Sequence, residues 1–261
     1  MKTLCLNQSK GSRPVPAVLA FTLIELLVVI SIIAVLAGLV VGVAPAASKR
    51  MREARINAEL AALVSAIEAY KVKYGVYPPD NYDPTNRVTN PTLNSLYYEL
   101  TGVLVDNNPA NPRIISAEDN TVINPDVFQK YFGREGVMNS IPLIPAPTPA
   151  AQNKLDREQK KNLIRREFKK GQYAEIFRST SDPGYVDLEV LAVGFSGDAS
   201  GKKGSGFSWP PRSPISEQPI KTNPGLNPWR YVSTNPTNNP GRFDLWAEIR
   251  ERDRTTIVGN W

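Results

Sequence analysis

The sequence predicts an α+β fold in which one long N-terminal helix packs against a small C-terminal antiparallel sheet. Three observations predict it. A long apolar stretch begins at about residue 21, an amphipathic helical pattern follows it directly, and alternating apolar and polar residues appear only near the C-terminal end. Twenty-three prolines and 17 glycines among 261 residues favour an irregular, loop-rich body over a helical bundle.

These patterns divide the chain into five segments with different expected roles. The segments are a basic leader at 1–20, an apolar helix at 21–47, its amphipathic continuation at 48–75, a variable loop-rich region at 76–183, and C-terminal strands at 184–261.

The apolar helix has the length of a membrane span. No charged residue occurs from Leu26 to Ala47, a run of 22 residues. At about 1.5 Å per residue, this run matches the roughly 30 Å hydrocarbon thickness of a bilayer. Lys2, Lys10 and Arg13 precede it with no acidic residue among the first twenty, which predicts a cytoplasmic leader and a translocated body.

Glu25 interrupts the apolar helix close to its start. A carboxylate in such a helix costs about 2.5–3.5 kcal/mol, so it usually has a function and a partner. A secretory signal cleaved near Ala44-Pro45-Ala46 is one alternative, but its apolar core would be about half as long. A plain membrane anchor explains the length without explaining Glu25, and a carboxylate that reaches the membrane interface is a further alternative.

The string FTLIELLVVISIIAVLAGL at 21–39 resembles the class III signal of type IV prepilins and type II secretion pseudopilins. The resemblance implies that prepilin peptidase cleaves between Ala20 and Phe21 and N-methylates Phe21. It also implies that Glu25 of one subunit neutralises the terminal ammonium of its neighbour during assembly. This family usually has glycine where the chain has Ala20, which bears on the efficiency of processing.

The helix should continue beyond a kink at Pro45 and end near Tyr74, because Gly75 and two prolines follow. Its apolar face follows a spacing of three to four residues and comprises Ile56, Leu60, Leu63, Ile67 and Tyr70 or Lys71.

Short helices are predicted in the variable region, from Asn90 to Gly102 and from Asp126 to Phe132. An extended Pro/Ala arm is expected from Ile141, and the charged segment 156–170 is expected to form a solvated helix.

Alternating residues predict strands at Tyr185–Gly194 and Arg242–Ile249, with shorter strands at Trp229–Val232 and Thr255–Val258. Asp187 and Glu189 are expected on a solvated face, and the 48–74 helix should cover the apolar face of the sheet.

Two further segments are similar to the G-type major pseudopilins of type II secretion: YKVKYGVYPPD at 70–80 and FDLWAEIRERDRTTIVGNW at 243–261. That similarity implies a pilin-like fold and a calcium site before the final Asn-Trp. The weak calcium candidates are Glu248, Glu251 and Asp253. Arginines alternate with them, so we expect these acids to pair with arginines and we expect no cofactor.

Composition argues against catalysis, because the chain has no histidine and its one cysteine, Cys5, lies in the leader. No basic cluster is interleaved with aromatic residues, so no nucleic-acid partner is expected despite a net charge of +6.

The resemblance implies a structural pseudopilus subunit for protein secretion, in the bacterial inner membrane as a single-pass protein and later in a periplasmic or surface filament. Its expected partners are other pilin-like subunits, prepilin peptidase and an inner-membrane assembly platform. The alternatives are a type IV pilus subunit for adhesion or DNA uptake and, in another class, a membrane-tethered enzyme or binding module.

Overall fold

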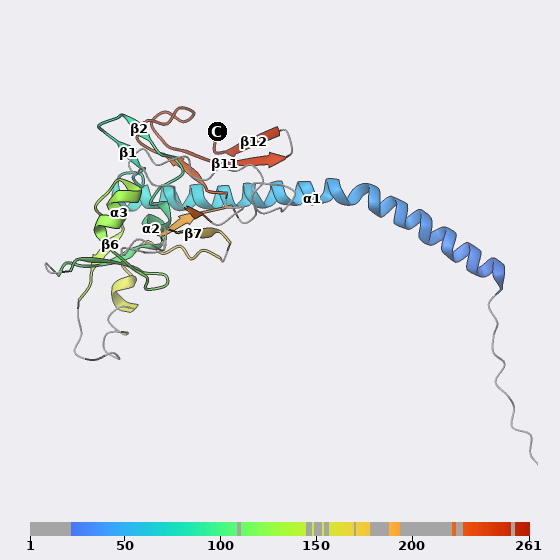
Figure 1. Cartoon of the computed structure of the whole chain (residues 1–261), viewed down its shortest axis with the longest axis horizontal. Helices are drawn as coiled ribbons and strands as arrows, with labels where there is room; N and C mark the ends of the chain where they lie inside the picture. The colour runs from blue at the N-terminus through green and yellow to red at the C-terminus, as the bar shows by residue number, and fades with distance from the viewer. Residues whose placement is uncertain are drawn as a thin grey trace, which may run out of the picture. The chain divides into compact units, whose positions relative to one another are not determined.

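The computed structural model describes residues 22–108, 111–144, 148, 153, 157–169, 171–177, 188–193, 221–222, 227–251 and 254–261. The described chain is a mixed α+β protein with small, mostly antiparallel sheets (Figure 1). It divides into two compact units, Met1–Arg52 and Glu53–Trp261, and the second unit is called the head below.

Helix α1 covers Leu23–Tyr74, 52 residues, and ends where the sequence predicts. Gly75 adopts a φ of +80°, and its N–H donates to the Lys71 carbonyl at 2.8 Å, so the glycine terminates the helix in a left-handed conformation. The helix continues past Pro45, which therefore does not end it. The side chains at 40–46 lie outside those described, and the kink at Pro45 stays a prediction.

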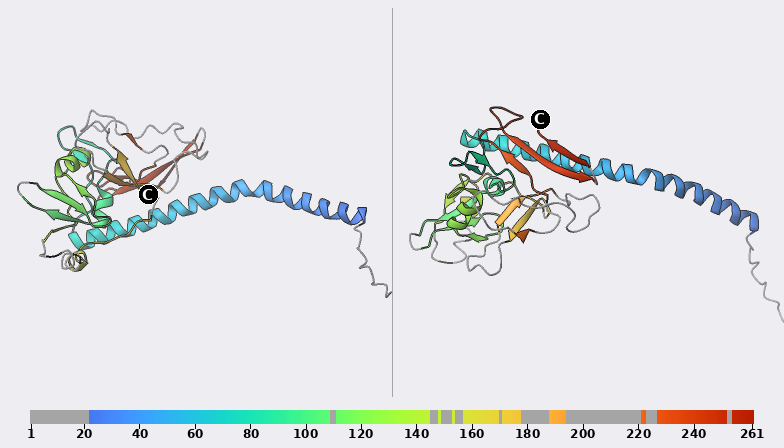
Figure 2. Two further views of the ribbon diagram at one scale, coloured as in Figure 1. Left: turned by 60° about the horizontal axis from the view of Figure 1, so that its bottom comes forward. Right: turned by 45° about the horizontal axis from the view of Figure 1, so that its top comes forward.

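The predicted apolar face of the second half of α1 is confirmed. The side chains that are buried on it are Ile56, Leu60, Leu63, Ile67 and Tyr70. Lys71, the alternative to Tyr70, is only partly covered. The buried face belongs to the same hydrophobic core as Leu245, Ala247 and Ile249, so this part of α1 covers C-terminal strands as expected. Figure 2 shows these strands running beside the helix.

The two short helices of the variable region exist, although one begins later than predicted. Helix α3, Pro125–Phe132, is capped by the Asn124 side chain, which accepts the Asp126 N–H. Helix α2 covers only Leu96–Thr101. Its predicted first residues instead form a turn, because Asn90 Oδ1 accepts the N–H groups of Thr92 and Leu93 at 3.2 Å.

The variable region also contains strands that the sequence did not predict. They are β1 (Tyr82–Asp83), β2 (Val88–Thr89), β3 (Val103–Asp106), β4 (Arg113–Ser116), β5 (Val122–Ile123) and β6 (Ser140–Pro142). The last four form one sheet in the order β5-β4-β3-β6, with β6 parallel to β3. Each has at most four residues, too few for a clear alternation of apolar and polar positions.

The charged segment was wrongly predicted as a solvated helix. Among its described residues, only 157–160 are helical, and 164–169 are without regular structure. Leu163 and Phe168 are buried, and the Arg166 N–H donates to the Leu100 carbonyl at 2.9 Å. Contacts with α2 therefore override the local helical preference. We call residues 157–169 the basic strap.

The remaining strands form two three-stranded antiparallel sheets, where the sequence predicted one. The strands are β7 (Tyr173–Phe177), β8 (Leu188–Leu191), β9 (Lys221–Thr222), β10 (Arg230–Val232), β11 (Asp244–Glu251) and β12 (Arg254–Gly259), in the orders β8-β7-β9 and β10-β11-β12. The four predicted strands correspond to β8, β10, β11 and β12, whereas β7, in the variable region, and β9 were not predicted. A bridge between Ala192 and Pro228 lies between the two sheets.

Glu189 on β8 was wrongly predicted to be solvated, because it is buried and its backbone N–H donates to the Tyr98 hydroxyl at 2.9 Å. Its predicted companion, Asp187, lies outside the described residues.

Candidate functional site

Glu25 and Thr22 form a reciprocal capping pair at the start of α1. Glu25 Oε2 accepts the Thr22 N–H and hydroxyl, each at 2.9 Å, and the Glu25 N–H donates to Thr22 Oγ1 at 3.2 Å. This geometry is a capping box, which satisfies donors that the first helical turn leaves free. Sequence reasoning missed this role, although Thr-x-x-Glu before an apolar run is its usual signal. The Glu25 carboxylate is exposed within this unit.

Large apolar side chains cover every side of the helix from Leu23 to Leu39, and all of them are between 45% and 81% exposed. They are Leu23, Ile24, Leu26, Leu27, Val28, Val29, Ile30, Ile32, Ile33, Val35, Leu36 and Leu39. A helix that is apolar all round is normally buried in protein or in lipid.

No helix within the described part of the chain is long and apolar enough to cross a membrane.

The remaining predicted processing and anchoring positions are only partly described. Ala20 and Phe21, the residues on either side of the predicted cut, lie outside the described residues. The predicted span also includes residues 40–46, whose side chains are not among those described. Of the predicted processing and assembly residues, the structure therefore gives side-chain geometry for Glu25 alone.

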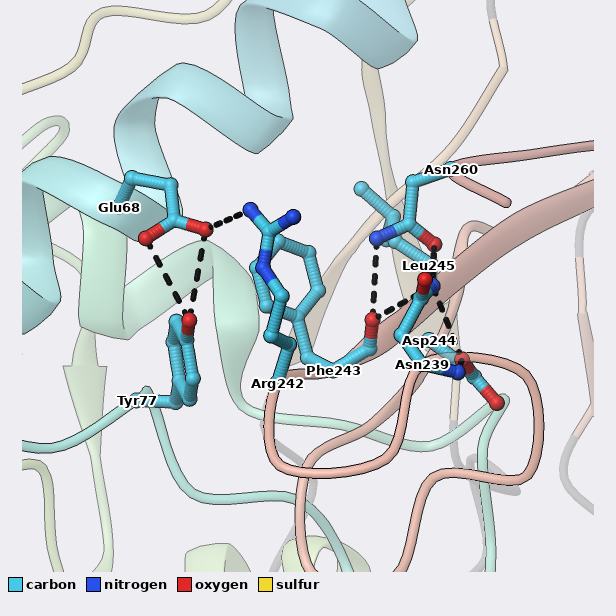
Figure 3. Close-up of polar contacts among 8 residues, drawn as sticks. All are labelled: Glu68, Tyr77, Asn239, Arg242, Phe243, Asp244, Leu245 and Asn260. Carbon is cyan, nitrogen blue, oxygen red and sulfur yellow. Dashed lines mark hydrogen bonds and ion pairs between the residues drawn. The ribbon is translucent and has the colours of Figure 1, made fainter.

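In the head, the Asn260 side chain ties the final residues to the start of β11 (Figure 3). Its Oδ1 accepts the Leu245 N–H and its Nδ2 donates to the Phe243 carbonyl, both at 2.9 Å. Asn239 Nδ2 adds a bond of 3.2 Å to Asn260 Oδ1. The Asn260 side-chain amide thus accepts and donates one backbone hydrogen bond each, as a residue of a neighbouring antiparallel strand would. Asn260 belongs to the final Asn-Trp pair on which the resemblance to the major pseudopilins partly rests, and these hydrogen bonds are its contacts in the structure.

Two buried carboxylates hold the loop 233–243, which joins β10 to β11. Asp244 accepts the backbone N–H groups of Thr237, Asn238 and Asn239 at 2.8, 2.9 and 2.9 Å. Asp80 accepts two N–H groups, those of residues 233 and 234, at 2.8 and 2.9 Å. Asp244 was predicted as one of the polar residues that alternate with the apolar face of its strand, yet it is only 3% exposed.

The same loop docks on the end of α1, as Figure 3 shows. Arg242 forms an ion pair with Glu68. The Tyr77 hydroxyl lies 3.4 Å from both Glu68 oxygens, and its ring packs edge-on against Phe243 with centroids 5.0 Å apart. Lys71 Nζ lies 4.1 Å from the centroid of the Tyr77 ring. Helix, loop and final strands are thereby joined at one place.

Of the three calcium candidates, the described structure gives side-chain contacts for Glu248 alone. Glu248 pairs with Arg230 on β10 at 3.2 Å. The Glu251 side chain and Asp253 lie outside the described part of the chain. Among the described residues there is no group of three or more acidic, histidine or cysteine side chains that could hold a metal. The expected pairing of these acids with arginine is confirmed for Glu248, although its partner lies on another strand.

Glu99 is a fully buried acid in α2 that sequence reasoning missed. Its carboxylate accepts the Tyr70 hydroxyl at 2.7 Å and the N–H groups of Met138 and Asn139 at 3.1 Å. The Asn139 side chain also bonds to the Glu99 carbonyl at 2.9 Å and to the backbone of Ile164. One buried carboxylate thus connects α1, α2 and the turn before β6.

Burial raises the pKa of Glu99, and the hydrogen bonds from Tyr70, Asn139 and Met138 oppose that rise only in part. The folded head therefore keeps this proton to higher pH than the unfolded chain, whose glutamates titrate near 4.5. Since the folded state binds more protons in that window, its stability should fall as pH rises from about 4.5 through the folded pKa and then level off.

We expect Glu99→Gln to remove this part of the pH dependence, because glutamine does not titrate. Urea unfolding of the full chain in detergent, repeated between pH 4 and 8, measures it. The difference between parent and variant isolates Glu99 from the other acids, and parallel curves for the two proteins would contradict the assignment.

Comparison with protein-family models, with curated proteins and with solved structures finds no significant match.

Proposed function

We propose that the chain is a pilin-like structural subunit of a pseudopilus, of the type II secretion kind. It inserts in the inner membrane through the apolar half of α1, is cut between Ala20 and Phe21, and polymerises through that helix. The observation that carries the proposal is the exposed apolar surface from Leu23 to Leu39, on a helix whose second half forms part of the core of the head.

The two halves of α1 differ in whether their apolar side chains are covered by the rest of the chain. The buried face from Ile56 to Tyr70 is already satisfied by the head. The exposed apolar side chains before residue 40 belong to the other unit and require lipid or other copies of the chain to cover them. A single helix that anchors a folded head and leaves its other end for association suits a structural subunit.

Glu25 supplies the specificity of that association. Its carboxylate is exposed and bonded only locally, through Thr22, among the contacts that the structure gives it. After cleavage, the ammonium of Phe21 of a neighbouring subunit would provide an opposite charge. Such a pair at 4 Å interacts by about 4 kcal/mol at an effective dielectric constant of 20.

Glu25→Ala should abolish incorporation into filaments while leaving the head folded, because the substitution removes the charge that pairs with the neighbour. Incorporation is measured by sedimentation of sheared filaments followed by immunoblotting.

Thr22→Ala is the matched control for this test. It breaks the capping box, typically worth about 1 kcal/mol, yet keeps the carboxylate. If the two substitutions impair assembly equally, Glu25 acts as a helix cap and the assembly role is wrong.

The mature chain should begin at N-methylated Phe21. Mass spectrometry of the N-terminal peptide from the membrane fraction tests this, with Ala20→Gly as a comparison that should be processed at least as fast. A mature terminus at Ala47 would instead support cleavage as a secretory signal.

A further inference from the structure

A hollow of about 570 Å³ lies in the head between α1 and the segment that leads into β7. Arg55 of α1 contributes to one wall, and Arg166 and Lys169 of the basic strap contribute to the other. Glu59 and Glu167 also line it, so the ionisable groups of the hollow have a net charge of +1. The excess of positive charge and the two guanidinium groups favour an anionic ligand that accepts several hydrogen bonds.

The basic strap holds its charges in fixed places. Residues 157–169 contain six basic and two acidic residues, a net charge of +4. Leu163 and Phe168 are buried, and the backbone N–H groups of Ile164 and Arg166 are bonded to Asn139 and to the Leu100 carbonyl. Because these buried side chains and backbone hydrogen bonds already hold the strap in place, it loses little conformational entropy when it binds a ligand.

Four of the six cations of the strap divide into two groups. Lys160 Nζ donates to the Ala117 carbonyl at 3.0 Å, and Lys161 pairs with Glu158 at 2.8 Å, so these two serve contacts within the head. The Arg166 guanidinium instead lies 5.5 Å from the Phe168 ring, which supports it beside the hollow. Lys169, at the same hollow, is exposed.

The residues of this hollow begin soon after the proposed membrane span in the sequence. Arg55 follows Ala47, the last residue of the uncharged run, by eight positions. Of the residues in between, Lys49, Arg50 and Arg52 are basic and Glu53 is acidic, which gives this stretch a net charge of +2. Basic residues near an anionic surface each gain about 1 kcal/mol.

We propose that the hollow binds the phosphate group of an anionic phospholipid headgroup, held by Arg55, Arg166 and Lys169. The shared chemistry is that of a phosphate anion, which two guanidinium groups and an ammonium can bind together. The choice of a lipid rests on the proposed membrane anchor, whereas the phosphate site itself depends only on the head.

The test uses the full chain in a non-ionic detergent and titration calorimetry with three probes: dihexanoyl phosphatidylglycerol, dihexanoyl phosphatidylcholine and inorganic phosphate. We expect saturable binding of phosphatidylglycerol and none of phosphatidylcholine. The variant Arg166→Gln/Lys169→Gln should weaken binding about tenfold or more. Arg157→Gln/Lys161→Gln removes the same charge from the same strap outside the hollow and should change it less than about twofold.

The outcomes are distinct. Equal binding of inorganic phosphate and phosphatidylglycerol supports the phosphate site and identifies free phosphate as a sufficient ligand. The proposal is overturned if neither phosphatidylglycerol nor inorganic phosphate binds, or if the two double variants lose equal affinity for phosphatidylglycerol. It is also overturned if Arg166→Gln/Lys169→Gln changes only the association between copies of the chain and leaves lipid binding unchanged. Because the assay does not depend on filaments or on processing, a failure of the proposed function leaves its result interpretable.

Discussion

Glu99→Ala should lower the free energy of unfolding of the head by at least about 3 kcal/mol. The substitution leaves three donors without their acceptor, namely the Tyr70 hydroxyl and the N–H groups of Met138 and Asn139. Each unsatisfied buried group costs about 1–3 kcal/mol, and the cavity left by the side chain adds to that. Domains are usually stable by only about 5–15 kcal/mol, so this loss is a large fraction of the total.

Burial also raises the pKa of the Tyr70 hydroxyl, with the Glu99 carboxylate as the next cause. The phenol therefore stays protonated and remains a donor throughout the accessible pH range. It cannot relieve its loss of an acceptor by ionising, which is why the expected cost is high.

Urea unfolding of the full chain in detergent, followed by near-ultraviolet circular dichroism, measures the change. Glu135→Ala is the control, because Glu135 is an exposed acid in the same part of the head and its removal should cost less than about 0.5 kcal/mol. A change below 1 kcal/mol for Glu99→Ala would show that the buried network does not hold the head together.

The long helix could be predicted because its signals are local and repeated. An apolar residue recurs at each turn from Ile56 to Tyr70, and Gly75 with Pro78 and Pro79 ends the pattern within a few residues. The four predicted C-terminal strands were found for the same reason, since alternation persists across most of β11. Local periodicity is the information that a single sequence carries most reliably.

The strands of the variable region could not be predicted because their pairing is non-local and short. Strand β6 contains Pro142 and pairs in parallel with β3, 37 residues earlier at the Val103–Ser140 position. Proline is a signal against a strand, yet it is tolerated at a sheet edge, where β6 lies. Only the three-dimensional arrangement shows that this proline is at an edge.

The buried acids were missed because their partners lie far away in the sequence. Glu99 is satisfied by residues 29 to 40 positions away, and nothing near it predicts burial. The Thr22–Glu25 capping box differs, because all its atoms come from four consecutive residues. That contact could have been read from the sequence, and it gives Glu25 a local role that the assembly test must separate from its proposed one.

Asp244→Ala should lower the free energy of unfolding by about 3 kcal/mol and release the loop 233–243. The carboxylate accepts three consecutive backbone N–H groups, those of Thr237, Asn238 and Asn239, at 2.8–2.9 Å. Hydrogen bonds to a charged group contribute about 1.5–3 kcal/mol each, and solvent reaching the opened loop restores part of the loss. The three loop amides should therefore exchange with deuterium faster than those of β11.

The matched control is Asp106→Ala, which removes an aspartate from the end of another strand. Its partner is the partly exposed Arg113 at 2.5 Å, and such surface pairs contribute about 0–1 kcal/mol. If Asp244→Ala costs no more than Asp106→Ala, the loop is held by Asp80 and by the Arg242–Glu68 pair instead.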